Sequence, residues 1–513
     1  MARGHVTDER PTDDSVRGLG RSSLINLIGF GVFGLANFLL LAVMTRRLGT
    51  SGAGALLEAI AVFSILARTA MLGADIALVR FTSRFIARER RGEMRTLYGV
   101  ALAPVLAVGT LAGLAMFALA EPLGRALADG VAREHLITHL RVMAPFVPVA
   151  TVYQVVEGGS RGFGTMLPSV VVERIGRSIT LPGLMLAAIA WGAGATGIAL
   201  AWAGPYAVAL IPMGLWVVAL VRRAEGAVGR AAPAAIPTRE LARRVWRFSL
   251  PRAFAGMFAF LISWIDALML GAMKGASAVG VYSAATRWLI AGNFAGTAVT
   301  QAFAPRVSRA LAIHGSTAGR RLFQDATALL VLVAWPAYLT AIVFAPLLLS
   351  AFGDDFVVGA HVIAIVGAGF LVASSAGPID MLLLMAGRSS LSLVNAAVAL
   401  AVNFVANLVL IPPFGIEGAA WAWAASLVVS NALPVFQMWR SHGIQPYGPR
   451  TRRALLIVST GGLALLAARS LLGASVAGLT LGLLLAAGVV AVGIRVTPDR
   501  LGVGELLGRS SRW

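Results

Sequence analysis

The sequence predicts an all-α, polytopic membrane protein with about 14 transmembrane helices, arranged as two pseudo-symmetric six-helix lobes plus an extra C-terminal helix pair. Its 513 residues have a mean hydropathy of +0.81 and are 13% charged, whereas soluble proteins carry about 25% charged residues. Apolar runs recur along the whole chain, with the length of about 20 residues that crosses a bilayer as a helix. A weak internal repeat predicts that the chain has two similar lobes.

The repeat consists of two stretches that recur in the same order. Residues 49–84 and 275–309 share a glycine-bearing turn, a long apolar run and a basic end, at an offset of about 226 residues. TGIALAWA (196–203) matches EGAAWAWA (417–424) at an offset of about 221 residues. Two similar halves of one membrane protein are the simplest account, since internal symmetry is common in transporters.

The chain begins with a polar stretch of mixed charge, residues 1–23, which we expect to be a disordered cytoplasmic tail. It is not a signal peptide, because the apolar run that follows is too long and ends in no cleavage-like site. The N-lobe, residues 24–221, follows with six predicted spans. These spans lie at about 24–44, 55–79, 96–120, 138–160, 167–190 and 194–221.

A cytoplasmic linker, residues 222–247, joins the two lobes and is rich in Arg, Ala and Pro. Its second part, TRELARRVWRFS, places Leu241, Val245 and Phe248 at helical spacing among arginines. This pattern predicts an amphipathic helix that lies on the inner membrane surface and is held there by anionic lipid. The alternative is a linker that does no more than connect the lobes.

The C-lobe, residues 248–438, contains the second set of six spans. They are predicted at about 248–271, 281–303, 325–349, 358–386, 390–411 and 416–438. Residues 439–513 hold a basic connection, two further spans at about 454–472 and 474–495, and a cytoplasmic tail. The extra pair has no counterpart in the first half, and it brings the predicted total to 14.

The net charge of +20 suggests a nucleic-acid-binding protein, but the distribution of the charge argues against one. Roughly 31 of the basic residues fall in connections on one side of the predicted spans and 5 on the other. The positive-inside rule makes the rich side cytoplasmic, and both termini belong to it. We therefore expect a multi-pass protein of the cytoplasmic (cell) membrane, with membrane lipids and no nucleic acid as partners.

Catalytic and metal-binding motifs are missing, so we expect no enzyme and no cofactor. The single lysine, Lys274, is followed by glycine, which excludes a phosphate loop ending in GK[ST]. His135 and His139 are four residues apart, but a solvated helix face explains them better than a metal site. Asp354 and Asp355 are better explained as residues that cap the start of a helix than as a metal-binding pair. Transport is the remaining class of function.

The most informative residues are polar groups inside spans, because a charge at the bilayer centre costs about 2.5–3.5 kcal/mol on insertion scales and usually faces a wet cavity. Arg68 and Asp75 lie seven residues apart on one stripe of the second span. Arg287 and Gln301 lie on the equivalent stripe of the second half. The two stripes predict a central cavity between the lobes, and scattered polar contacts between helices are the alternative.

Other polar residues in spans have simpler interpretations. Glu173 and Arg177 are spaced for an ion pair within one helix, although Arg177 is also a candidate for the cavity. Asp266 lies near a span end, where a charge reaches water more easily than at the centre. Asn403 and Asn407 share a helix face, which favours contacts between helices over ligand contacts.

Several motifs together resemble the polysaccharide (lipid-linked oligosaccharide) flippase family of the MOP superfamily, which is related to the MATE exporters. These motifs are NFVANLVLIPPFGIEGAAWAWA (403–424), TRRLGTSGAG after the first span and LLLSAFGDDF between the ninth and tenth. The resemblance implies two six-helix lobes around a cavity, alternating access, and movement of an undecaprenyl-pyrophosphate-linked glycan from the inner to the outer leaflet. It also implies glycosyltransferases and a glycan polymerase as partners.

The resemblance bears on the cavity as well. Lipid II flippases of the superfamily carry an arginine in the eighth span, in a YA.R pattern, and Tyr282, Ala285 and Arg287 occur here in similar order. Cation-coupled drug exporters often use an acidic residue in the first span, where this chain has only Asn26 and Asn37 as polar amides. A MATE-like cation-coupled exporter of small molecules is the alternative, and a scaffold for glycan assembly is a third class.

Overall fold

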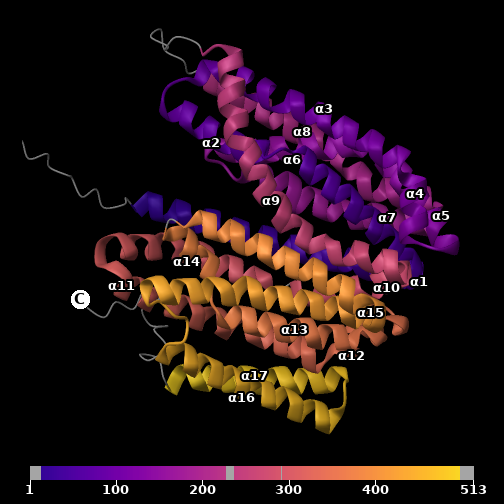
Figure 1. Ribbon diagram of the computed structural model, residues 1–513, viewed down its shortest axis with the longest axis vertical. Coiled ribbons are helices and arrows are strands. Elements are labelled where there is room, and N and C mark those ends of the chain that lie inside the picture. The colour runs from indigo at the N-terminus through magenta and orange to yellow at the C-terminus, as the bar shows by residue number, and fades with distance from the viewer. Residues whose placement is uncertain (1–12, 227–235, 291, 387, 497–513) are drawn as a thin grey trace, which may run out of the picture. The chain divides into compact units, whose positions relative to one another are not determined.

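The structure, a computed structural model, describes residues 13–226, 236–290, 292–386 and 388–496. Helices make up 91% of it, and no strand occurs in the described part of the chain. Figure 1 shows these helices as long rods. The predicted all-α class is therefore confirmed.

The described residues of the first half form eleven helical elements of very different lengths. They are α1 (Asp13–Ala70), α2 (Ala74–Ala87), η1 (Arg91–Glu93), α3 (Met94–Ala118), α4 (Ala120–Leu127), α5 (Gly130–Met143), α6 (Phe146–Ser160), η2 (Arg161–Phe163), η3 (Ser169–Arg177), α7 (Ser178–Ala190) and α8 (Gly194–Gly226). Of the η elements, η3 is a π-helix and the others are 3₁₀-helices.

In the second half, the structure describes ten elements, which include the longest helices after α1. They are α9 (Thr238–Lys274), α10 (Ala276–Ile290), α11 (Asn293–Val343), α12 (Ala345–Ser350), η4 (Asp354–Gly359, a 3₁₀-helix), α13 (Ala360–Ser375), α14 (Ile379–Met385), α15 (Ser389–His442), α16 (Pro449–Leu472) and α17 (Val476–Val496).

Within the described residues, 8 helical segments are long and apolar enough to cross a membrane, and the pair α5 and α6, bent by 55°, would make a ninth. Some of these segments hold two predicted spans. In α1, Gly49 (φ 67°, ψ −176°) breaks the helix between spans 24–44 and 55–79. In α15, Gly415 (φ 56°, ψ −127°) does so between spans 390–411 and 416–438. The count of 14 stays a prediction.

Contacts divide the chain into two compact units, which are described separately here. Unit 1 comprises the described residues of Met1–Leu40, Leu66–Ala115 and Val142–Ala253. Unit 2 comprises those of Leu41–Ile65, Met116–Arg141 and Phe254–Trp513. The boundaries of the lobes at residues 24–221 and 248–438 stay a prediction.

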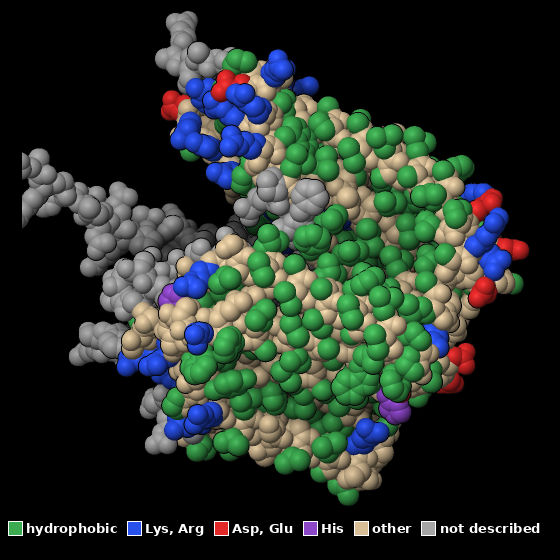
Figure 2. Space-filling view, in the orientation of Figure 1, with side chains coloured by type: hydrophobic (Ala, Val, Ile, Leu, Met, Phe, Trp, Pro, Cys, Tyr) green, Lys and Arg blue, Asp and Glu red, His purple; other side chains and the backbone are tan. Residues whose placement is uncertain are grey.

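The core of unit 1 lies where α2, α3, α6 and α8 meet the start of α9. Leu78, Leu97, Tyr153, Met213 and Leu241 come from these five helices and are all buried there. The opposite faces of α3 and α8 are covered with exposed leucine, isoleucine and valine, and Figure 2 shows apolar side chains on the surface of these helices. Such faces suit contact with lipid tails rather than water.

The start of α9 is the helix that the linker sequence predicts, and it is amphipathic. Leu241 and Val245 are fully buried in the core of unit 1, whereas Arg243 and Arg244 are exposed. Because its own unit covers the apolar face, this segment does not lay that face on the membrane surface. The expected surface-lying helix is therefore wrong in placement, although its helical spacing is confirmed.

In unit 2, the extra C-terminal pair, α16 and α17, lie side by side (Figure 1). Gly461 and Gly482 bring the two helices close, against Ala486 and Leu465 respectively, as small residues do between membrane helices. Val458 of α16 is buried in a cluster with residues of α11. The extra pair therefore belongs to unit 2 and packs against α11.

A reciprocal contact in unit 2 supports the internal repeat. Gly54 lies against the backbone of Ala276, and Gly280 lies against the backbone of Thr50. At the offset of 226 residues, Thr50 is equivalent to Ala276 and Gly54 is equivalent to Gly280. Each of the two contacts is therefore the repeat equivalent of the other. Reciprocal contacts of this kind are what a two-fold relation produces. A Cβ atom at either glycine would overlap backbone atoms, which explains why both positions hold glycine.

The helix breaks follow the same repeat. Gly49 and Gly275 both have positive φ, 67° and 79°, and they are equivalent at the offset of 226. Gly194 and Gly415 also have positive φ, 58° and 56°, and they are equivalent at the offset of 221. Positive φ favours glycine, so both sequence echoes coincide with shared backbone turns.

Candidate functional site

Arg68 and Asp75 lie on either side of a helix break in unit 1. Leu72 (φ 52°) and Gly73 (φ 71°) end α1 and begin α2, so the continuous helix expected over residues 55–79 is wrong. The two side chains still meet, with Arg68 Nη1 3.4 Å from Asp75 Oδ2. The hydroxyl of Ser249, on α9, donates to the carbonyl of Leu72 at 2.5 Å and thereby holds the break in place.

Burial differs between these two partners. The Arg68 side chain is 33% exposed and that of Asp75 is 10% exposed. Gly158 of α6 packs directly against the Cβ atom of Asp75, which fixes the carboxylate while the guanidinium remains more accessible. The Asp75 carboxylate is therefore held in place, whereas the Arg68 guanidinium is partly accessible to solvent.

Arg177 forms the best-satisfied charge cluster of unit 1. Its Nε and Nη2 atoms donate to the two carboxylate oxygens of Glu173 at 2.8 and 2.6 Å, and the Tyr153 hydroxyl donates to the same carboxylate at 2.7 Å. The guanidinium carbon also lies 4.5 Å from the centroid of the Tyr206 ring. The predicted ion pair is confirmed, and it lies in the π-helix η3, a kind of element that occurs frequently at functional sites.

Arg287 contrasts with both arginines of unit 1. It lies in the last turn of α10, half-buried, and makes no ion pair with any described carboxylate. Its Nε atom is buried without a hydrogen-bond partner among the described residues. The neighbouring core residues Tyr282, Ala284 and Thr286 are buried as well. A bidentate donor group whose charge no described carboxylate compensates is thus held inside a membrane-spanning unit.

Three of the residues predicted to line a common cavity lie in different units, and the side chain of a fourth lies outside the described residues. Gln301 lies on α11, and its side chain falls outside the described residues. Arg68 and Asp75 belong to unit 1 and Arg287 to unit 2. Their common chamber stays a prediction.

Sequence reasoning missed a buried carboxylate in unit 2, Asp266, and the polar side chains that surround it. Asp266 of α9 accepts hydrogen bonds from the Asn407 amide at 2.6 Å and the Tyr282 hydroxyl at 3.0 Å. Asn403 lies beside Asn407 and is fully buried. Asp266 itself is only 4% exposed, so the expectation that it reaches water is wrong. The four-residue spacing of the asparagines was the available signal, but nothing in the sequence identified their acidic partner.

The histidine pair differs from the expected solvated helix face at one of its two positions. His139 is 2% exposed, on the inner face of α5, so the expected solvated face does not include it. In the described part of the chain, no group of three or more His, Cys, Asp or Glu residues could hold a metal ion. Asp354 and Asp355 are exposed in the first turn of η4, although neither caps it with a side-chain hydrogen bond.

Comparison with known structures shows the fold. The chain is similar to a lipid II flippase MurJ in an inward closed conformation, with a TM-score of 0.70, 10% identity, and coverage of 93% of this chain and 99% of that one. It is also similar to a multidrug resistance MATE family transporter of the MOP superfamily in an inward-facing conformation. That match has a TM-score of 0.64, 15% identity, and coverage of 80% of this chain and 94% of the other.

Two curated relatives match part of the chain. One is "Probable low-salt glycan biosynthesis flippase Agl15" of Haloferax volcanii, 25% identical over 198 residues, which cover 38% of this chain and 42% of the relative. The other is "Uncharacterized membrane protein YabM" of Bacillus subtilis, 25% identical over 347 residues and 64% of each chain. The matched region thus spans less than two thirds of either relative.

Two family models match the sequence directly. The MatE model matches residues 251–409. The model of the family described as "Polysaccharide biosynthesis protein" matches residues 19–311, more than half of the chain. The chain is therefore a multi-pass membrane protein that belongs to the polysaccharide biosynthesis protein family.

Proposed function

We propose that this protein is a flippase that moves an undecaprenyl-pyrophosphate-linked glycan from the inner to the outer leaflet of the cytoplasmic membrane by alternating access. The observation that carries the proposal is Arg287, an arginine inside a membrane-spanning unit without a carboxylate partner among the described residues. Membership of the polysaccharide biosynthesis protein family supports it, as does the likeness to a glycan biosynthesis flippase.

The chemistry of the cargo suits the arginines. A guanidinium offers fixed charge and parallel donors that match a pyrophosphate. In this proposal Arg287 and Arg68 bind the pyrophosphate, Asp75 pairs with Arg68 in the same cavity, Gln301 adds a neutral donor, and Arg177 lines the cavity from its cluster with Glu173. A membrane potential that is negative inside favours outward movement of the anion by about 2.3 kcal/mol per charge per 100 mV.

The orientation belongs to the proposal too. In this proposal both termini and the linker 222–247 lie in the cytoplasm, where glycosyltransferases assemble the cargo. A glycan polymerase receives the cargo in the outer leaflet after translocation. Reporters fused after Tyr447 and after Trp513 should both read as cytoplasmic. A periplasmic signal from either one would contradict this orientation.

Reconstitution tests the function itself. The purified protein is placed in vesicles that carry a fluorescent polyprenyl-pyrophosphate-linked sugar in one leaflet, and an impermeant quencher reports the labelled lipid in the outer leaflet. We expect faster exchange than in protein-free vesicles, and no acceleration for a labelled neutral lipid. Equal acceleration of both lipids, or of neither, would overturn the proposal.

A cation-coupled exporter of small molecules is the second candidate, and Asp266 favours it. This carboxylate is fully enclosed, and its hydrogen-bond partners among the described residues, Asn407 and Tyr282, are neutral. A cation could therefore compensate its charge. A transport assay with an organic cation under an imposed sodium or proton gradient distinguishes the two candidates. Gradient-driven uptake of the drug with no movement of the lipid would favour the exporter.

A further inference from the structure

A pocket lined by arginines lies in unit 1, apart from the residues proposed to bind the cargo. It has a volume of about 430 Å³ and is lined by six arginines, namely Arg80, Arg84, Arg88, Arg90, Arg244 and Arg247. Figure 2 shows Lys and Arg side chains gathered over the ends of α2 and α9. The arginine distribution predicts that this end of the unit faces the cytoplasm.

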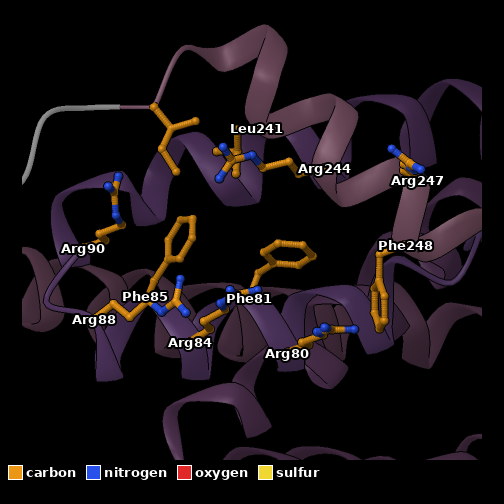
Figure 3. Close-up of a pocket in the computed structure, with 11 residues that line it drawn as sticks. Arg80, Phe81, Arg84, Phe85, Arg88, Arg90, Leu241, Arg244, Arg247 and Phe248 are labelled. Carbon is orange, nitrogen blue, oxygen red and sulfur yellow. The ribbon is translucent and has the colours of Figure 1, made fainter.

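Helical spacing explains how the arginines converge. On α2, Arg80 and Arg84 lie four residues apart and therefore share one face, and Arg88 follows at the end of the helix. On α9, Arg244 and Arg247 are three residues apart and also share a face. Figure 3 shows the arginines of α2 on one side of the pocket and those of α9 on the other. The pocket is thus built by two helices that are packed together.

Apolar side chains hold the two helices at this distance. Phe81 and Phe85 are buried on α2 and point toward α9, and Leu241 is buried on α9 above them (Figure 3). The guanidinium of Arg80 also lies 4.2 Å from the centroid of the Phe248 ring. The charges therefore surround an apolar floor that belongs to the core of unit 1.

The charge of this pocket is not balanced from within. Arg90 pairs with Glu93 at 2.9 Å, and Arg244 pairs with Glu240. The remaining four, Arg80, Arg84, Arg88 and Arg247, make no ion pair with any described residue, and no acidic residue lines the pocket. Like charges in one pocket repel each other, so a polyanion that enters it would relieve that repulsion and receive several charge-assisted hydrogen bonds.

We propose that this pocket is a binding site for a pyrophosphate group on the cytoplasmic side of the protein. A pyrophosphate carries more than one negative charge and presents several oxygens to arginine forks, whereas a phosphodiester headgroup carries one charge for four arginines. The apolar floor suits the first isoprene units of a lipid-linked pyrophosphate. Assigning the ligand to such a lipid rests on the proposed function, but the binding of pyrophosphate does not.

Binding to the full-length protein in nanodiscs of phosphatidylcholine tests the site. Calorimetry with inorganic pyrophosphate should give a dissociation constant that the double variant Arg84→Gln/Arg247→Gln raises at least about tenfold. The matched control, Arg222→Gln/Arg223→Gln, removes two exposed arginines from α8 in the same unit and outside the pocket. It should change the constant less than about twofold.

Further arms identify the source of the pyrophosphate and guard against misfolding. Geranylgeranyl pyrophosphate that binds at least about tenfold tighter than inorganic pyrophosphate assigns the site to a lipid-linked ligand. The variant Arg84→Lys/Arg247→Lys keeps the charge and should bind more tightly than the glutamine variant. The same weakening in the control and pocket variants, or no binding by the unaltered protein, would overturn the site. Flippase activity that persists in a variant without pyrophosphate binding would separate the site from the transport function.

Discussion

The two units treat the charges inside their membrane-spanning helices differently. In unit 1, Arg177 is bound to Glu173 by two hydrogen bonds, and Arg68 lies 3.4 Å from Asp75. In unit 2, among the described residues, Arg287 has no carboxylate partner and Asp266 is hydrogen-bonded to neutral groups. The two arginine–carboxylate pairs of unit 1 are thus balanced within the protein, whereas no described residue of opposite charge pairs with Arg287 or Asp266.

This difference has an energetic consequence. A buried ion pair repays part of its desolvation cost through its own attraction, while a lone buried charge must be compensated by something else. A bound ligand of opposite sign can supply that compensation. We therefore expect substitutions in the Glu173–Arg177 pair to affect stability most and substitutions of Arg287 to affect ligand binding most.

The largest expected effect is on stability, from Glu173→Gln. This change leaves Arg177 without its carboxylate partner in a largely buried pair, whose side chains are 14% and 23% exposed. Breaking a fully buried pair costs about 3–5 kcal/mol, so we expect a loss of about 3 kcal/mol here. Thermal unfolding of the purified protein in detergent measures the loss. The double variant Glu173→Gln/Arg177→Gln should recover much of the stability, because it removes the unpaired charge as well.

A matched control comes from a surface pair. Glu121 accepts a hydrogen bond from Arg141 at 2.7 Å, and both side chains are about half exposed. Glu121→Gln should cost less than about 1 kcal/mol, as for most exposed pairs. If the two glutamine variants were equally stable, unit 1 would not depend on its internal charge balance.

The next effect is on transport, from Arg287→Gln. The rate of lipid-linked glycan exchange in reconstituted vesicles should fall at least about tenfold, since the charge-assisted contact to the pyrophosphate is lost. Thermal stability should stay equal or rise, because an unbalanced half-buried charge is removed. Arg287→Lys should retain part of the rate but lack the bidentate fork.

The contrast between the variants is the informative result. A variant at Arg287 that is unstable but transports normally per folded molecule would place this arginine among the structural residues. The comparison between the units would then fail at its central point.

The sequence predicts contacts between polar side chains of one helix far better than contacts between polar side chains of different helices. Helical spacing alone predicted Glu173 with Arg177, because both partners lie on the same helix. It placed Asp75 near Arg68 but overlooked the break at Leu72 and Gly73, since positive φ at a leucine has no sequence signal. It missed Asp266 with Asn407 because α9 and α15 are distant in the chain, and their packing depends on the tertiary fold.

The fold shows the same limit. Hydropathy identified the apolar segments, because each must satisfy the backbone inside the bilayer. The first repeated stretch predicted a glycine-bearing turn at both Gly49 and Gly275, and both have positive φ. The turn shared by Gly194 and Gly415 lies just before the second repeated stretch and is visible only in the structure. The apolar face of the segment around Leu241 was assigned to the membrane surface, however, because a hydrophobic stripe does not reveal whether lipid or protein covers it.

A smaller effect is expected from Asp266→Asn in unit 2. The amide oxygen that replaces the carboxylate accepts weaker hydrogen bonds from Asn407 and Tyr282 than the charged group does. We therefore expect a loss of about 1–3 kcal/mol. If a monovalent cation balances Asp266, the unaltered protein should unfold at a higher temperature in sodium chloride than in choline chloride, by the linkage between binding and stability. The variant should lose that difference. A cation effect of equal size in both proteins would contradict a role for Asp266.

The smallest effects on stability should come from the pair Arg68 and Asp75, and they test whether a balanced arginine still takes part in transport. Because the Arg68 side chain is 33% exposed, Arg68→Gln should change the free energy of unfolding by less than about 1 kcal/mol. Its exchange rate should fall less than that of Arg287→Gln, since Asp75 already neutralises part of the charge offered to the cargo. Asp75→Asn removes this competition, so we expect it to keep or raise the affinity for the lipid-linked pyrophosphate. The same variant should lose affinity if Asp75 instead holds Arg68 in its binding position, and measuring both variants in one vesicle preparation separates neutralisation from positioning.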